Sequence, residues 1–175
     1  LFPIYYLFVF ATAAGAAVAL IPLSGTAAGI MNMPVDEITK KHPFRQGVGK
    51  VSELALGYQG GVSAFAKMAR NTKGVDLRVL FEPVWEAAPE SRKEKALKLF
   101  ERAQRRGEIT TRLLSLEAWL ACECIKLGWR ETNSAITTAW SIMESAIIDA
   151  IRNPGRHCPA LKCSYVVEGR YLWCT

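Results

Sequence analysis

Charged side chains are missing from the beginning of this sequence. No Asp, Glu, Lys, Arg or His occurs before Asp36, and no positively charged stretch precedes the apolar residues as it would in a secretory signal peptide. Residues 1–23 are long enough to span a bilayer core, for which about 20 apolar residues suffice. The missing charge therefore keeps a membrane helix open as one interpretation of this segment.

Cysteine and histidine pairs with metal-ligand spacing are also lacking. The five cysteines are an odd number, and no two of them show the CxxC spacing of zinc sites. His157, Cys158 and Cys163 lack paired spacing, and Cys122 and Cys124 lie two apart in a helical pattern, where side chains point to different faces. We therefore expect no bound metal, and reduced thiols in a cytosolic protein.

A helical stripe of mixed chemistry stands out in what is present. Lys50, Leu54 and Tyr58 recur every four residues, and at about 3.6 residues per turn such positions drift only about 40° per step. A cation, an apolar side chain and an aromatic ring suit the phosphate, sugar and base of a nucleotide. An amphipathic helix with a solvated lysine explains the spacing equally well. The net charge of +6 permits nucleic-acid binding without requiring it.

Residues 45–69 read RQGVGKVSELALGYQGGVSAFAKMA. This segment resembles the fingers helix of family A DNA polymerases, in the form found in bacteriophages, which closes over the incoming nucleotide. Residues 128–144 carry a tryptophan, a short turn and a second tryptophan before a glutamate, and residues 169–174 resemble the strand leading back towards the palm. The resemblance covers residues 33–175, as a fingers-like helical region. Residues 1–32 are expected to be an apolar segment, either non-homologous or membrane-like.

The resemblance implies a nucleotide site on the fingers helix. Lys50 would neutralise the triphosphate and protonate the leaving pyrophosphate as the catalytic acid, Leu54 would lie against the sugar, and Tyr58 would border the base. The family's arginine lies four residues before the lysine, but Arg45 is five before Lys50 and Gln46 holds the matching position. On a regular helix Arg45 would point about 140° away from the lysine. Either a bulge or the helix start absorbs one extra residue, or Arg45 reaches the terminal phosphate from the preceding loop.

DNA contacts, metal and partners follow from the same resemblance. Tyr58, Gln59 and Gly60 would bind DNA beside the nascent base pair. Nucleotidyl transfer uses two metal ions held by carboxylates; in the family these are Mg²⁺ ions held by the palm, whose His-Asp-Glu motif is absent here. We expect this chain to be a fragment of a DNA-directed DNA polymerase that is inactive by itself. The complete enzyme is expected to act in the host-cell cytoplasm. Its partners would be DNA primer-template, deoxynucleoside triphosphates and the remaining polymerase domains.

The expected fold is mainly α: a helical fingers subdomain ends in a short β-hairpin and follows an apolar N-terminal helix. The main helix should begin at residues 46–48 and end at residues 57–58, before a glycine pair that interrupts it and could act as a hinge. Further helices are expected over residues 75–88 and 89–107, and a hairpin over residues 162–173.

Two long helices are expected after the charged helix over residues 89–107. Thr110 or Thr111 should cap the first, with Trp119 in the core. Asn133 and Ser134 should cap the second, whose buried stripe is expected to consist of Ile136, Trp140, Met143, Ile147 and Ile151. By the resemblance, Trp129 and Trp140 would brace the fingers.

Two other classes of function stay open. One is a small membrane-anchored helical interaction protein built on residues 1–23, which membrane fractionation would distinguish from a polymerase fragment. The other is a non-enzymatic nucleic-acid-binding module, which would bind DNA in a salt-dependent manner that is indifferent to added nucleotide.

Overall fold

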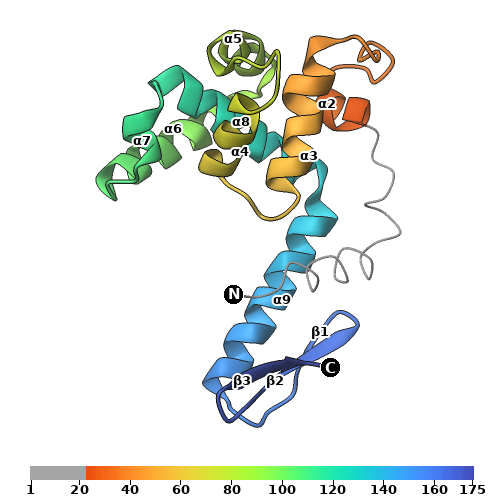
Figure 1. Cartoon of the computed structure of the whole chain (residues 1–175), viewed down its shortest axis with the longest axis vertical. Coiled ribbons are helices and arrows are strands. Elements are labelled where there is room, and N and C mark those ends of the chain that lie inside the picture. The colour runs from red at the N-terminus through yellow and green to blue at the C-terminus, as the bar shows by residue number, and fades with distance from the viewer. Residues whose placement is uncertain (1–22) are drawn as a thin grey trace. The chain divides into compact units, whose positions relative to one another are not determined.

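The computed structural model describes residues 23–175 and shows a mainly helical chain that ends in a small antiparallel sheet (Figure 1). The mainly α fold with a C-terminal hairpin is thus confirmed. The apolar segment interpreted as a membrane helix lies, apart from Leu23, outside the described residues. In the part that the structure describes, no helix combines the length and apolarity needed to cross a membrane.

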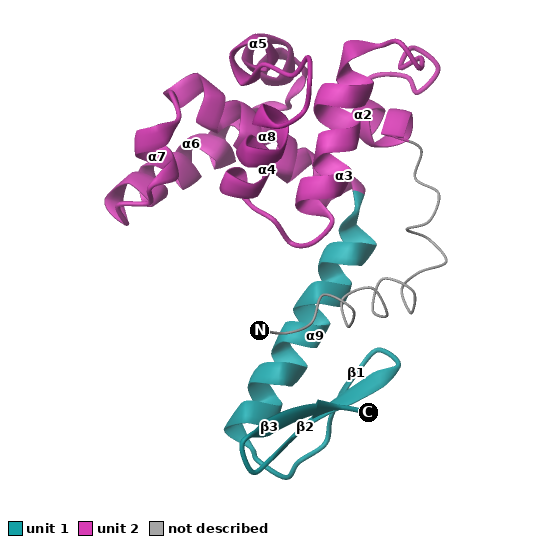
Figure 2. Cartoon of the chain, viewed as in Figure 1, with its two compact units in different colours: residues 1–20, 133–175 teal, residues 21–132 magenta. Residues whose placement is uncertain are grey.

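The described chain falls into two compact units, coloured separately in Figure 2. The larger unit, residues 23–132, is helical, and the smaller unit, residues 133–175, combines one helix with the sheet. The larger unit consists of α2 (Leu23–Met31), the π-helix η2 (Arg45–Lys50), α3 (Val51–Leu56), α4 (Val62–Arg70), α5 (Leu77–Ala87), α6 (Glu90–Arg105), α7 (Thr110–Leu113) and α8 (Leu116–Thr132). The expected helices over residues 75–88 and 89–107 correspond to α5 and α6.

Helix α8 forms the centre of the larger unit. Of its 17 residues, 11 are buried, and it contacts each α-helix from α2 to α7. A helix that is apolar around most of its circumference is stable only when neighbours cover it on several sides. Trp119 and Trp129 are 3% and 1% exposed, so the prediction that Trp119 belongs to the core is confirmed.

The start of α8 corrects the predicted cap. Thr110 and Thr111 lie in the short helix α7, and the long helix begins only at Leu116. Ser115 is the residue at this start: its hydroxyl accepts the Ala118 backbone N–H at 3.3 Å, as helix-capping serines do. Thr110 instead accepts the indole N–H of Trp119 at 3.2 Å.

The smaller unit packs α9 (Ser134–Arg152) against a three-stranded sheet of order β1-β2-β3. Its strands are β1 (Cys158–Ala160), β2 (Cys163–Glu168) and β3 (Tyr171–Cys174), all antiparallel. The hairpin expected over residues 162–173 is β2–β3, turning at Gly169 with φ +61°. Strand β1 was not expected, because Pro159 in so short a segment obscures the strand pattern.

The buried side of α9 differs from the predicted stripe. Ala146 and Ala150 are buried against β1 and β2, with Met143 and Ile147 packed beside them. Ile151 is 58% exposed, so its predicted burial is wrong. Small alanines face the sheet because they let helix and strands approach closely, which a stripe chosen by hydrophobicity alone does not reveal. Asn133 precedes α9 as predicted, but its side chain makes no capping hydrogen bond.

Candidate functional site

The predicted fingers helix is one continuous helical segment with an unusual first turn. It starts with a short helical stretch at Pro43 and Phe44, passes through η2 and continues directly into α3, which ends at Leu56. The backbone N–H of Val51 donates to the Gln46 carbonyl, a hydrogen bond that spans five residues. Such π-turns are rare and occur mostly as single turns within α-helices, frequently at functional sites.

This π-turn decides between the two placements considered for Arg45. Arg45 lies inside the helix and not in the preceding loop. A π-turn takes more residues than an α-turn, so positions four and five before Lys50 both fall close to its side of the helix. Arg45 is half-buried, whereas Gln46 and Lys50 are exposed. Arg45 and Gln46 thus both belong to the π-turn that ends at Lys50.

The predicted stripe faces solvent. Lys50 is exposed, and Leu54 and Tyr58 are 48% and 52% exposed; Tyr58 lies in the turn that follows α3. The opposite side of the segment, which includes Val51 and Leu56, is buried. An ordinary amphipathic helix also has a solvated lysine, and here a leucine and a tyrosine lie on the same open side. The stripe thus presents a cation, an aliphatic side chain and a ring together.

A carboxylate on the inner side holds this segment in place. Glu53 accepts a hydrogen bond from the Thr26 hydroxyl at 2.6 Å and another from the Trp129 indole N–H at 3.1 Å. Both donors are buried, at 0% and 1% exposed. Glu53 therefore ties α3 to α2 and to α8. Sequence reasoning did not single it out, although a carboxylate on the inner face of an amphipathic helix is a signal that could have found it.

The end of the stripe is shaped by two neighbouring residues. Gln59 adopts φ +63°, a left-handed conformation that is uncommon for residues other than glycine, and its N–H donates to the Leu56 carbonyl at 3.0 Å. A side chain at Gly60 would overlap the carbonyl oxygen of Ala55, whereas nothing lies within 4 Å of the corresponding position at Gly61. Close packing thus requires glycine only at the first position of the pair. The interruption predicted here is confirmed, since α4 begins at Val62.

The start of the segment is held just as closely. A side chain at Gly49 would overlap the carbonyl oxygen of Leu23, so the backbone of η2 lies directly against α2. Gly47 has more room, because the nearest side-chain atoms, from Leu80 and Val75, would be 3.6 and 3.7 Å away. The π-turn is therefore packed against α2 through Gly49.

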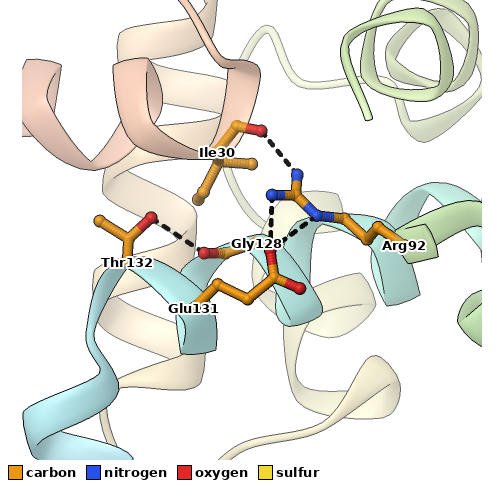
Figure 3. Close-up of polar contacts among 5 residues, drawn as sticks. All are labelled: Ile30, Arg92, Gly128, Glu131 and Thr132. Carbon is orange, nitrogen blue, oxygen red and sulfur yellow. Dashed lines mark hydrogen bonds and ion pairs between the residues drawn. The ribbon is translucent and has the colours of Figure 1, made fainter. Parts of the chain in front are cut away.

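A buried arginine joins the helices behind the site (Figure 3). Arg92 of α6, 7% exposed, donates to Glu131 of α8 at 2.7 and 3.1 Å and to the Ile30 carbonyl of α2 at 2.9 Å. Gly128 makes space for the guanidinium, since a Cβ there would lie 2.8 Å from its nitrogen. Thr132 closes the turn by donating to the Gly128 carbonyl at 2.9 Å. This cluster connects α2, α6 and α8.

The metal-ligating side chains do not gather into a site in the part of the chain that is described. No group of three or more His, Cys, Asp or Glu residues there is placed to hold an ion. His157 instead lies 3.3 Å from the Ser164 hydroxyl. The described residues therefore do not fit the Mg²⁺ ions that the polymerase resemblance implies.

A comparison with known proteins matches part of this chain. Over 50 residues the chain is 50% identical to a DNA polymerase of Bacillus phage SP02. This match supports a relationship to DNA polymerases. The matched stretch is 29% of this chain and spans 8% of the phage polymerase. No protein-family profile matches the chain, and no solved structure matches it.

Proposed function

We propose that this chain is part of a template-directed DNA polymerase of family A, of the bacteriophage type, and that η2 and α3 form the nucleotide-binding face of its fingers. The observation that carries the proposal is the open stripe of Lys50, Leu54 and Tyr58 on a segment whose other side is buried. The 50% identity to a phage DNA polymerase over 50 residues supports a relationship to DNA polymerases.

The proposed roles follow the order of the stripe. Lys50 binds the triphosphate and donates a proton to the pyrophosphate as the bond to the α-phosphorus breaks. Arg45 and Gln46, one π-turn earlier, hold the terminal phosphate, because charge-assisted bonds to phosphate are stronger than neutral ones. Leu54 lies against the sugar, and Tyr58 offers its ring to the base.

The turn after the stripe is the proposed DNA contact. Tyr58, Gln59 and Gly60 border the nascent base pair of the primer-template. Gln59 is left-handed and Gly60 packs against the Ala55 carbonyl, which supports a positioning role for this turn. Whether the glycine pair also acts as a hinge stays a prediction.

The metal chemistry belongs to other parts of the proposed complete enzyme. Two Mg²⁺ ions held by carboxylates would stabilise the attacking and leaving oxygens, and the described residues provide no such site. We therefore propose that this chain by itself does not polymerise. In the complete enzyme it would act in the host-cell cytoplasm, with the remaining polymerase domains and deoxynucleoside triphosphates.

Replacing Lys50 in the complete enzyme tests the proposal. We expect Lys50→Ala to slow single-nucleotide incorporation by about 100-fold, the usual loss when one preorganised donor to developing charge is removed. Lys50→Arg, which keeps the positive charge, should retain part of the rate. Rapid-quench measurement of one turnover at saturating nucleotide would separate this step from product release.

Lys67→Ala is the matched control, since Lys67 is an exposed lysine on the neighbouring helix α4. It should incorporate nucleotide at the wild-type rate. An unchanged rate in Lys50→Ala, or an equal loss in both variants, would reject the assignment of Lys50.

A further inference from the structure

Helix α6 carries a row of cations on one side. At about 100° per residue, five basic positions fall within an arc of about 100° around the helix, and all five are exposed. We call this set the α6 cation row: Lys95, Lys98, Arg102, Arg105 and the following Arg106. The glutamates of α6 lie together on one adjoining flank, outside this arc. The row therefore presents charge of a single sign to solvent.

Little in the described structure neutralises this row. Among the described residues, Lys98 is its one member with an ion pair, to Glu94 at 3.7 Å, and both side chains are mostly exposed, at 77% and 61%. Exposed pairs of this kind contribute little and are screened by salt. The row is thus available to a polyanion at the cost of one weak contact.

The helix beneath the row is firmly attached. Another side of α6 buries Ala96 and Ala103, at 0% and 4% exposed, and Arg92 anchors the helix through Glu131 and Ile30. A shallow groove of about 340 Å³ runs along the exposed side. The groove is lined by Ser91, Glu94, Lys95, Lys98, Leu99 and Arg102. The backbone that carries the cations is consequently held in place, beside a groove whose lining includes Leu99.

The length of the row matches a short stretch of nucleic-acid backbone. From Lys95 to Arg106 the helix advances about 16 Å, at about 1.5 Å per residue. A stacked strand carries one phosphate per about 3.4 Å of its axis, so about five phosphates occupy that length. Five cations thus face about five phosphates.

We propose that the α6 cation row binds the sugar-phosphate backbone of a single DNA strand without regard to sequence. The strand lies along the row, over the groove between Lys95 and Arg102 and then past Arg105 and Arg106, with one phosphate near each cation. In a polymerase this strand would be the template, and that identification rests on the proposed polymerase function. One straight row contacts one backbone, which favours a single strand over a surface that grips both strands of a duplex.

Salt-dependent binding of DNA to the 175-residue chain tests the proposal. Fluorescence anisotropy of a labelled single strand of about 20 nucleotides would be recorded across a range of salt concentrations. The logarithm of the affinity should fall with the logarithm of salt concentration with a slope of about −0.7 for each phosphate contacted, or about −3.5 for five. No nucleotide is added, so this assay can fail while the Lys50 incorporation test succeeds, and the reverse.

The decisive variant is Lys98→Gln with Arg102→Gln. Removing two contacts should reduce the slope by about 1.4, which corresponds to about 25-fold weaker binding at 0.1 M salt if the affinities converge at 1 M. Arg152→Gln with Lys162→Gln is the matched control, because both side chains are exposed on the smaller unit and the net charge changes equally. This control should keep the wild-type slope. Circular dichroism would show that both variants retain their helices.

Three results would overturn the proposal. The first is an equal loss of slope in the α6 variant and the control, which would mean that net charge alone binds the strand. The second is tighter binding of a duplex of the same length, with the same dependence on the α6 cation row. The third is binding of a polysaccharide polyanion such as heparin that depends on the row, without binding of DNA.

Discussion

Glu53 should contribute more to stability than a partly buried carboxylate usually does. Glu53→Ala removes two hydrogen bonds to a carboxylate, from Thr26 at 2.6 Å and from Trp129 at 3.1 Å. Hydrogen bonds to charged groups contribute about 1.5–3 kcal/mol each, so their joint loss should cost about 3–5 kcal/mol. Both donors are buried, which limits replacement of the carboxylate by water. Glu53→Gln keeps an acceptor oxygen and should cost about half as much.

Urea unfolding followed by circular dichroism measures this loss. Glu86→Ala is the matched control, because Glu86 is exposed on α5 and such surface changes usually stay within about 0.5 kcal/mol. Trp129→Phe removes one donor only, and a double-mutant cycle with Glu53→Ala isolates the energy of that bond. If Glu53→Ala is as stable as the control, the Glu53 carboxylate does not hold α3 against α2 and α8.

Two further predictions concern the packing of the larger unit. Gly49→Ala should be about 2 kcal/mol less stable than Gly47→Ala in urea unfolding. Both variants gain about 1 kcal/mol because alanine favours a helix over glycine, but only Gly49→Ala is overpacked, which costs about 1–3 kcal/mol. Equal stabilities would contradict the close approach of η2 to α2. Burial raises the pKa of Cys122 to about 12 and that of Cys124 to about 11, from an ordinary value of 9.0. Thiols in the unfolded chain ionise above pH 9, while the two folded thiols stay neutral. The free energy of unfolding should therefore be retained below pH 9 and fall by about 1 kcal/mol per thiol per pH unit above it. The double variant Cys122→Ala with Cys124→Ala should flatten that fall in unfolding measured from pH 8 to pH 10.5.

The sequence was sufficient for the features that repeat along a helix. The periodicity of Lys50, Leu54 and Tyr58 predicted one common side, and the structure exposes all three. The glycine pair predicted the break before α4, because glycine weakens helices wherever it stands. The burial of Trp119 likewise follows from its place in a broad apolar surface.

The features that depend on contacts between distant segments were not predictable in this way. The cap of α8 is Ser115 and not Thr110 or Thr111, because Thr110 is engaged by the indole of Trp119, and sequence proximity favours all three residues equally. The inward role of Glu53 depends on partners in α2 and α8, which lie far from it along the chain. A single sequence shows that a carboxylate can accept hydrogen bonds but not which donors it meets.

The π-turn connects these two kinds of feature. An arginine five residues before Lys50 is misplaced on a regular α-helix but close to the lysine when the turn is wider. The turn is packed where Gly49 meets the backbone of α2 at Leu23. Helix α2 falls within residues 1–32, the segment predicted to be unrelated to the fingers, yet it contacts both η2 and α8. The geometry of the phosphate end of the proposed site therefore depends on α2, so any homology boundary at residue 32 would divide elements that pack together.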